Sequence, residues 1–458
     1  MSEWLNYCRI LAMIQRFNFL KPHHLLRRKA RQKKDYLLAL DIGTEFVKAL
    51  IFKIEDKSFD DKDGSGKQGV VVGVGRQRQL PGNMLAGVVA DIDGVVSSCQ
   101  NAIEQASSLA RVKPKRAVIG VAGEFIKGST TDFLHKREEP TKEINSAELQ
   151  NIIQKVQKKS FDKMRGQLAW ETGRSEVEIK PINALISEVQ VDGYRVTNPL
   201  GFQGKEFFLS IFNVYAPLIH LRALENIASK LDLELLSIAA ESYALTKSSG
   251  FNPAVGAIFV DIGGGTTDVT LVRQGRVEGI KSLSLAGRTF TKRLSQTLGL
   301  SLSEAERVKL KHAHQRLSQS VQWKIREILK KDIRVWLTGM ELVLEEFDQM
   351  RGAGGRQAKF FPSPILLCGG GSLLPGIKNI LKREDIKRRW VDKFPFSQPP
   401  QIGFIQSNQI DNIVDKTNIL KGPENITPLA LASLSLEIAV DEEKALPPIL
   451  RRVVRIMR

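Results

Sequence analysis

The sequence contains few cysteines. Of its 458 residues only Cys8, Cys99 and Cys368 are cysteines, and they lie far apart. A small, odd-numbered and widely spaced set excludes a disulfide-stapled fold and is typical of a reducing compartment. With 42% apolar and 26% charged residues, a chain of this length can bury a full core without such staples, and its composition argues against wholesale disorder.

The sequence also lacks a long uninterrupted apolar run. A membrane-spanning helix needs ~18 consecutive apolar residues. The segment that comes closest, residues 4–20, is interrupted by polar side chains that include Arg9 and Arg16. A secretory signal would open with positive charge ahead of an apolar stretch, and the first four residues have neither feature. We therefore expect a protein that is neither integral nor exported.

Acidic residues are scarce at both ends of the chain. The net charge is +18, but residues 1–34 carry nine Lys and Arg against Glu3 alone, and residues 446–458 carry four Arg and no acid. These two segments supply 12 of the 18 surplus charges, so the body is nearly balanced. The body also lacks a basic stripe interleaved with aromatic residues, and nucleic-acid binding is therefore not expected.

The last residues have an amphipathic pattern. After Pro447 and Pro448, apolar and arginine residues separate onto two stripes at helical spacing. A helix over this segment would be ~16 Å long, so it could lie in a membrane interface but not cross it. Its wholly basic polar face favours an anionic lipid surface, with packing on the protein's own core as the alternative. The residues expected to bind the membrane are Ile449, Leu450, Arg451, Arg452, Val453, Val454, Arg455, Ile456, Met457 and Arg458.

The N-terminal segment is the other strongly basic region. Residues 4–17 could form an apolar face, and residues 21–34 then add seven Lys and Arg. A second lipid-surface anchor is one hypothesis for this segment. A disordered basic arm, or a translation start assigned too early, are the alternatives.

Three glycine-containing loops each follow an apolar strand. They are Asp41 to Thr44, Asp261 to Asp268, and Gly369 to Ser372. The pattern predicts strands on both sides of the first two loops, at 36–40 and 46–54 and at 257–260 and 269–272. It predicts that the third loop leads from a strand at 365–368 into a helix over about 373–381.

The residue types in these loops suit a polyphosphate. Glycine lets phosphate oxygens approach the backbone N–H groups, because no Cβ intrudes. Hydroxyls of Thr44, Thr266 and Thr267 add donors, and Asp41 and Asp261 at the strand ends can hold a hydrated Mg²⁺. Each loop alone is a weak signal, but the three in this order predict a site that grips a polyphosphate from both sides.

On these residues the chain resembles the actin-like ATPase superfamily. Asp41 to Thr44 looks like its first phosphate loop, Asp261 to Thr267 like its second, and Gly369 to Gly376 like its adenosine motif. The resemblance implies an α/β fold of two sheet-and-helix halves around a nucleotide cleft, with ATP and Mg²⁺ as cofactors. Weak ATPase activity at most is expected.

The resemblance also implies roles for individual residues. Lys48 would reach a phosphate, Glu306 and Lys309 would contact the nucleoside, and Glu241 would be catalytic by orienting the attacking water. Asp41 and Asp261 would be the metal ligands. The implied nucleotide-binding set is Asp41, Gly43, Thr44, Lys48, Gly263, Gly264, Gly265, Thr266, Thr267, Glu306, Lys309, Gly369, Gly370, Gly371 and Ser372.

Within the superfamily the chain is similar to the FtsA family of bacterial division proteins, over roughly residues 36–440. The segments that carry this similarity are Gly87 to Gly94, Ala117 to Gly123, Pro181 to Gly201 and Leu285 to Phe290. The resemblance implies a peripheral protein at the cytoplasmic face of the membrane, at the division septum. It would self-associate into filaments, anchor the tubulin-like FtsZ and bind anionic lipid through its tail.

The resemblance implies a layout in seven parts, one of them an inserted small α+β subdomain. They are a basic N-terminal extension (1–35), the start of the first half (36–122), the inserted SHS2-like subdomain (123–216), a return to the first half (217–254), the second half (255–390, with a helical outer part at 286–361), a second return to the first half (391–440) and the membrane-targeting tail (441–458).

One departure from the family pattern concerns charge, because Glu45 follows Thr44 where a small residue is usual and would place a negative charge near the phosphates. Two other functions stay open. The first is an actin-like scaffold of type IV pilus assembly, and the second, less favoured, is a soluble small-molecule kinase. A chaperone is disfavoured because no long substrate-binding domain follows residue 440.

Overall fold

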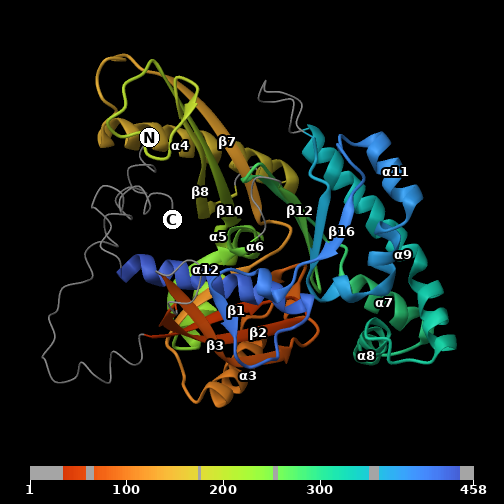
Figure 1. Ribbon diagram of the computed structural model, residues 1–458. Helices are drawn as coiled ribbons and strands as arrows, with labels where there is room; N and C mark the ends of the chain where they lie inside the picture. The colour runs from red at the N-terminus through yellow and green to blue at the C-terminus, as the bar shows by residue number, and fades with distance from the viewer. Residues whose placement is uncertain (1–34, 58–65, 174–176, 251–255, 350–359, 444–458) are drawn as a thin grey trace, which may run out of the picture.

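The structure, a computed structural model, describes residues 35–57, 66–173, 177–250, 256–349 and 360–443 (Figure 1). The two ends predicted to contact lipid, including Ile449 to Arg458, lie outside these ranges. Within them, no helix combines the length and the apolar character that a bilayer-spanning segment requires. Cys99 and Cys368 are both buried free thiols.

A six-stranded sheet forms the first half. Its order is β11 (Glu234–Ala240), β6 (Arg116–Val121), β1 (Tyr36–Ile42), β2 (Phe46–Asp56), β3 (Lys67–Arg78) and β17 (Ile413–Asp415). The first three strands along the chain are an antiparallel meander, and β6 pairs with β1 in parallel. The continuous apolar run of β1 is buried because helices cover both faces of this sheet.

Helices lie above and below this sheet in Figure 1. On one face α3 (Ile92–Ala110) packs against β2 and β3 and contacts α5 (Leu218–Lys230). On the other face α12 (Ile426–Glu443) packs against β1, β2 and β6 and against α6 (Glu241–Ser248). Helix α3 starts at residue 92, because the Asp91 side chain accepts from the backbone N–H groups of Asp93 and Gly94.

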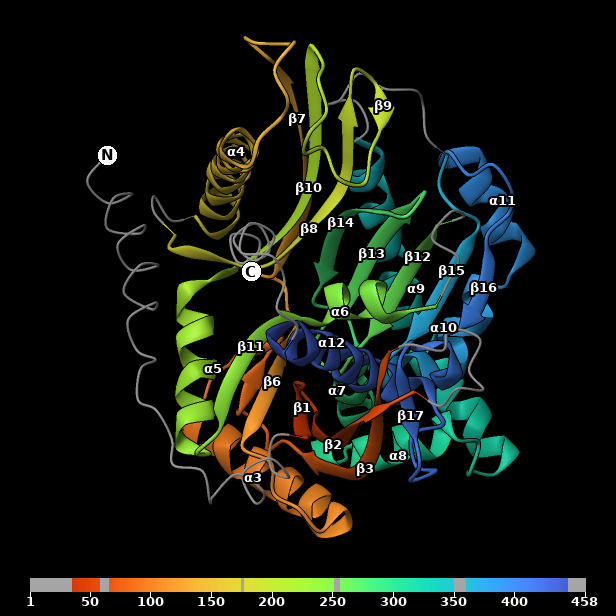
Figure 2. The same cartoon turned by 60° about the vertical axis from the view of Figure 1, so that its left-hand side comes forward.

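A nine-stranded sheet runs through the second half and beyond it (Figure 2). Its order is β16 (Gln401–Phe404), β15 (Pro364–Cys368), β12 (Ala257–Ile262), β13 (Thr267–Arg273), β14 (Arg276–Leu283), β7 (Lys127–Lys136), β10 (Glu206–Pro217), β8 (Ile179–Val191) and β9 (Tyr194–Arg195). The strands predicted around all three glycine loops are therefore present. A two-stranded hairpin, β4 (Met84–Leu85) with β5 (Val88–Val89), completes the sheets.

The strands of the segment predicted as an insert extend this second sheet. Strand β14 pairs with β7 through Gly279 with Ser129 and through Ile280 with Gly128. Helix α4 (Ser146–Thr172) packs on β7 and β10 and closes a separate apolar cluster around Val156. The sequence predicts these strands as a separate insert between two parts of the first half, and the hydrogen-bonded neighbour of β7 in the structure is β14 of the second half. The boundaries of the seven-part layout remain predictions.

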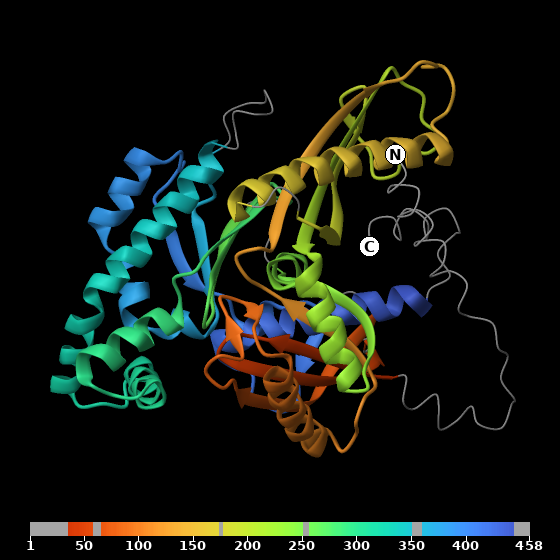
Figure 3. The ribbon, with the colours of Figure 1, turned by 180° about the vertical axis from the view of Figure 1, so that it is seen from behind.

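Helices cover the outer side of the second half (Figure 3). They are α7 (Gly287–Leu298), α8 (Leu302–Ala313), α9 (Gln319–Gln349), α10 (Pro375–Leu381) and α11 (Glu384–Lys393). The predicted helix over 373–381 begins only at Pro375, because a 3₁₀ turn, η3 (Gly370–Leu373), comes first and proline favours the first helical position. Trp336 on α9 is fully buried against this sheet.

Candidate nucleotide site

Two hairpin turns of the same design face each other between the two sheets. In the turn between β1 and β2, the Gly43 N–H donates to the Phe46 carbonyl at 3.1 Å. In the turn between β12 and β13, the Gly263 N–H donates to the Thr266 carbonyl at 2.9 Å. A Cβ on Gly43 would lie 2.7 Å from the Phe46 oxygen. The first turn therefore needs glycine for its close backbone approach.

The tips of these two turns touch. A Cβ on Gly264 would lie 2.7 Å from the Glu45 Cβ, and a Cβ on Gly265 would lie 2.5 Å from the Thr44 hydroxyl. Any larger residue at either glycine would push the turns apart. The two predicted phosphate loops, about 220 residues apart in the sequence, therefore meet in the fold.

The third glycine loop packs against the end of β12. Gly369 has a φ of +80°, and a Cβ there would lie 2.1 Å from the Asp261 carboxylate. A Cβ on Gly371 would lie 2.9 Å from the Ile262 carbonyl. Glycine is thus required twice, once for a left-handed backbone and once for close packing.

The three loops line one cavity of about 120 Å³. Fifteen of the seventeen predicted residues with a catalytic, nucleotide or metal role line it: Asp41, Gly43, Thr44, Lys48, Glu241, Asp261, Gly263, Gly264, Gly265, Thr266, Glu306, Lys309, Gly369, Gly370 and Gly371. The structure thus brings together residues from both halves at the ends of β1, β12 and β15.

Two predicted residues lie outside this lining. The Thr267 hydroxyl donates to the Leu285 carbonyl at 2.7 Å and accepts from the Trp336 indole at 3.1 Å. The Ser372 hydroxyl donates to the Gly369 carbonyl at 2.6 Å. Both hydroxyls are used in holding the loops in place, and neither is directed into the cavity as a donor.

Carboxylates gather around Lys48 in the cavity. The Lys48 ammonium lies 3.1 Å from the Asp41 carboxylate. Burial lowers the pKa of Lys48, but the charge and hydrogen bond of Asp41 outweigh it, and the pKa rises. Burial raises the pKa of Asp261, and the hydrogen bond from Thr427 partly offsets this increase. Burial likewise raises the pKa of Asp268 to about 6.

Glu241 is the first residue of α6 and is buried. Its carboxylate lies beside β6, where a Cβ on Gly120 would approach it to 2.9 Å. Burial raises the pKa of Glu241 well above its usual value, and the charges of Asp41, Asp261 and Asp268 raise it further. The cavity therefore concentrates acidic groups beyond what a single lysine offsets.

This surplus of negative charge suits a divalent cation. Among the residues that the structure describes, no three His, Cys, Asp or Glu side chains form a preassembled metal cage. Mg²⁺ does not need one, because it commonly takes one or two carboxylates and fills its remaining positions with water and substrate phosphates. Asp41 and Asp261 fit that donor set.

Glu306 and Lys309 lie on one face of α8. The helix begins with a capping box formed by Ser301 and Glu304, which fixes its register. Residues three apart share a helix face, and the Lys309 ammonium lies 2.7 Å from the Glu306 carboxylate. Lys309 also donates to the Gly287 carbonyl at 2.9 Å. The pair is buried at the cavity wall.

The cavity lining includes residues that the sequence analysis missed. The Arg76 guanidinium lies 3.8 Å from the centre of the Phe46 ring, and Arg76, Glu424 and Thr427 all face the cavity. No motif marks them. Arg76 comes from β3, Glu424 from the 3₁₀ turn η5 (Pro423–Asn425) and Thr427 from the start of α12, and these elements reach the site only through tertiary packing.

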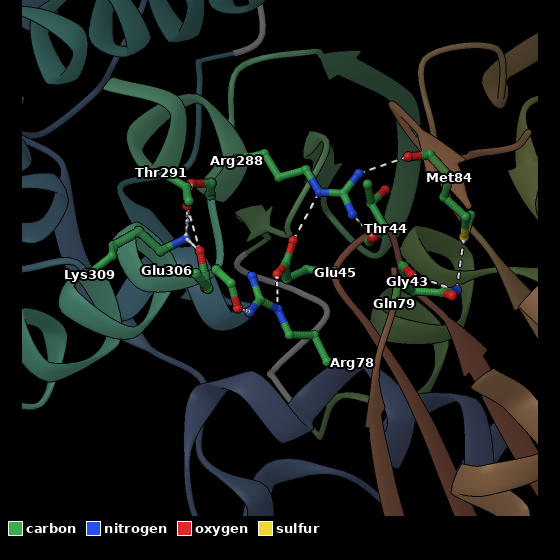
Figure 4. Close-up of polar contacts among 12 residues, drawn as sticks. Gly43, Thr44, Glu45, Arg78, Gln79, Met84, Arg288, Thr291, Glu306 and Lys309 are labelled. Atoms are coloured by element: carbon green, nitrogen blue, oxygen red, sulfur yellow. Dashed lines mark hydrogen bonds and ion pairs between the residues drawn. The ribbon is translucent and has the colours of Figure 1, made fainter. Parts of the chain in front are cut away.

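Glu45 lines the cavity, where the sequence predicts its negative charge. Two arginines offset that charge: the Glu45 carboxylate accepts from Arg78 at 2.7 Å and from Arg288 at 2.9 Å (Figure 4). The two guanidinium groups come from β3 and α7, so nothing local in the sequence indicates the pairing.

Known proteins match this chain in sequence. The sequence profile of the family described as "Cell division protein FtsA" matches residues 258–430. FtsA of Bacillus subtilis is 25% identical over 365 residues, which cover 75% of each chain. FtsA of Pseudomonas aeruginosa is 25% identical over 285 residues, which cover 62% of each chain.

A solved structure shares the fold. The structure described as "PilM-PilN type IV pilus biogenesis complex" aligns with a TM-score of 0.55 at 16% identity, covering 87% of this chain and 98% of that one. At this identity the similarity shows the fold alone, which is the actin-like ATPase fold. The family profile over residues 258–430 and the relatives above show that the chain is similar to FtsA cell division proteins.

Proposed function

We propose that this protein is a cell division protein that binds ATP with Mg²⁺ between its two halves. The observation that carries the proposal is the convergence of three glycine loops, far apart in the sequence, on one cavity. The relatives that match over most of the chain are named cell division proteins. Nucleotide would then set the conformation of the subunit and, through it, the state of a polymer.

The cavity residues have distinct tasks in this proposal. The glycine turns present backbone N–H groups to the phosphates, and Lys48 offsets their charge. Asp41 and Asp261 would hold Mg²⁺, which neutralises the phosphates when it is bound. Glu306 and Lys309 would face the nucleoside. Glu241 would orient the attacking water, and turnover would be weak at most.

We infer further that the protein polymerises at the cytoplasmic face of the membrane and anchors FtsZ there. The similarity to FtsA proteins supports FtsZ as the partner and the formation of filaments. The amphipathic, arginine-rich pattern of residues 449–458 supports contact with anionic lipid. In this proposal the SHS2-like insert at 123–216 and the other parts of the layout keep the boundaries predicted above.

A pilus-assembly scaffold is the second candidate, because the pilus complex has the same fold. Co-sedimentation of the purified full chain with FtsZ polymers separates the two functions. Recruitment to FtsZ polymers supports the division role. If vesicles bind the full chain but FtsZ polymers do not bind to it there, the pilus role would be favoured.

Nucleotide binding is tested by Asp261→Asn, measured by calorimetric titration with Mg-ATP. The variant keeps the shape of the residue but removes the charge beside Lys48, so we expect at least about a tenfold loss of affinity. Asp385→Asn is the matched control, because Asp385 is an exposed residue on α11, outside the cavity lining. Equal affinities for the two variants would reject the assignment.

A further inference from the structure

One arginine joins the two halves of the molecule over the cavity. Arg288, at the start of α7 in the second half, uses all of its guanidinium nitrogens on the first half (Figure 4). It donates to the Glu45 carboxylate at 2.9 Å, to the Met84 carbonyl at 2.7 Å and to the Thr44 carbonyl at 2.7 Å. A planar guanidinium is suited to such a fork of acceptors.

The backbone of the same residue holds the other phosphate loop. The Arg288 N–H donates to the Gly264 carbonyl at 2.7 Å, and the neighbouring Gly287 N–H donates to the Gly263 carbonyl at 3.0 Å. Arg288 therefore contacts the second loop through its main chain and the first loop through its side chain. Its position couples the two loops directly.

A second arginine repeats the connection from the opposite side. Arg78 on β3 donates to the other oxygen of Glu45 at 2.7 Å and to the Ser303 hydroxyl on α8 at 3.1 Å. The Glu45 side chain is only 11% exposed and that of Arg288 is 21% exposed. Charge-assisted bonds in such partly buried positions are stronger and less screened than surface pairs. We call Glu45, Arg78 and Arg288 the cleft latch.

The cleft is closed in this arrangement. The cavity of about 120 Å³ is smaller than the ~300–1,000 Å³ of usual small-molecule sites. The tips of the two phosphate loops are in contact, as Gly264 with Glu45 shows. A nucleotide can therefore enter only if the halves separate, and separation breaks the bonds of the cleft latch.

We propose that Arg288 is a positioning residue of the nucleotide site and that the cleft latch controls how fast nucleotide enters and leaves. The proposal rests on the proposed function for the identity of the ligand, a nucleoside triphosphate. The bonds of the latch join protein atoms only. Its breakage speeds both association and dissociation, whereas loss of a phosphate contact would speed dissociation alone.

The test uses the full chain and stopped-flow kinetics with a fluorescent ATP analogue and Mg²⁺. Arg288→Ala and Glu45→Gln should each raise the association and dissociation rates by about tenfold. The double variant should show little further change, because both substitutions break the same contact. Arg293→Ala is the matched control, since Arg293 lies on the same helix but pairs with Asp332 outside the cavity lining. Rates equal to those of this control would overturn the proposal.

Hydrogen exchange in the nucleotide-free protein separates failure of the latch from failure of the proposed function. Amides in 40–47 and 262–268 should exchange faster in Arg288→Ala and Glu45→Gln than in the wild type and in Arg293→Ala. If the two latch variants exchange faster but the wild type does not bind nucleotide, the latch is supported and the proposed function is rejected. Unchanged exchange with normal binding would overturn the latch. If Arg288→Ala does not fold, Glu45→Gln and Arg288→Lys, which keep the side-chain size, decide the same comparison.

Discussion

Asp41 and Lys48 are directly opposite each other in the ladder between β1 and β2. Their spacing of seven residues is the one expected for a hairpin whose turn holds a phosphate loop, and the ammonium lies 3.1 Å from the carboxylate. In an antiparallel pair, opposite residues point to the same face of the sheet. The register of this hairpin therefore places Lys48 beside the Asp41 carboxylate in the cavity.

Replacing Lys48 should weaken nucleotide binding. In Lys48→Met the Asp41 carboxylate loses its partner, and the phosphates lose a nearby positive charge. We expect the affinity for Mg-ATP to fall by about tenfold or more in equilibrium titration. Lys53→Met on the same strand is the control, because Lys53 pairs with Glu55 away from the cavity. A loss of equal size in both variants would contradict a specific role for Lys48.

Stability should depend on pH through the acidic cavity. The pKa of Asp268 is about 6 in the folded protein against an ordinary 3.8, so the folded state binds more protons between these values. Unfolding free energy should therefore fall as the pH rises from about 4 to 6 and then level off. In Asp268→Asn this fall should be smaller. Thermal unfolding of the nucleotide-free chain across this range measures it, with the exposed Asp392→Asn as control.

The segment predicted as an insert contains an ion pair, between Arg137 after β7 and Glu148 on α4, whose effect on stability has the opposite pH dependence. The Glu148 carboxylate receives two bonds from Arg137, at 2.7 and 3.0 Å, and the hydrogen bond from Arg137 lowers the pKa of Glu148. Stability from this pair is present above the ordinary value of 4.5 and is lost as the pH falls through the folded pKa.

Glu148→Gln should therefore destabilise the protein at pH 7. The buried Arg137 side chain would lose its anionic partner, at a cost of about 1–2 kcal/mol. The difference from the wild type should vanish in strong acid. Chemical denaturation at pH 7 and pH 3 checks this, and Glu139→Gln, in an exposed pair with Lys142, should change little. A difference that persists unchanged at pH 3 would show that the ion pair is not its source.

A methyl group in the second phosphate loop should separate the halves. In Gly265→Ala the new Cβ would lie 2.5 Å from the Thr44 hydroxyl, so the closed cleft could not form as it stands. We expect about a tenfold weaker affinity for Mg-ATP in equilibrium titration, with the fold retained. Gly166→Ala is the control, because nothing lies within 4 Å of the added methyl. Normal nucleotide affinity in Gly265→Ala would mean that the closed contact is not needed.

The tail should bind the membrane if the proposed function is right. Sedimentation with anionic vesicles should be lost when the chain is truncated after Glu443, and weakened by the paired change Arg451→Ala and Arg452→Ala. Each basic group at an anionic surface contributes ~1 kcal/mol, so the paired change should reduce binding by about tenfold or more. Neutral vesicles are the control. If the truncated and full chains sediment equally, the tail does not bind the lipid, and the basic N-terminal segment becomes the candidate for that contact.

The sequence by itself determined the three glycine loops and their flanking strands. These features depend on neighbours along the chain, since strand alternation and turn geometry set which way each side chain points. Fifteen of the predicted site residues line the cavity, but their convergence on it depends on how the two halves pack.

Only the tertiary structure decided that two arginines neutralise Glu45. It also decided that Arg76 and Thr427 line the cavity, and that the hydroxyls of Thr267 and Ser372 point away from it. Arg288 and Glu45 are separated by 243 residues, and their contact depends on how the two halves pack. The pairing of β14 with β7 is also non-local. Local patterns carry no information on such contacts, because long-range packing selects them among many arrangements with the same strands and helices.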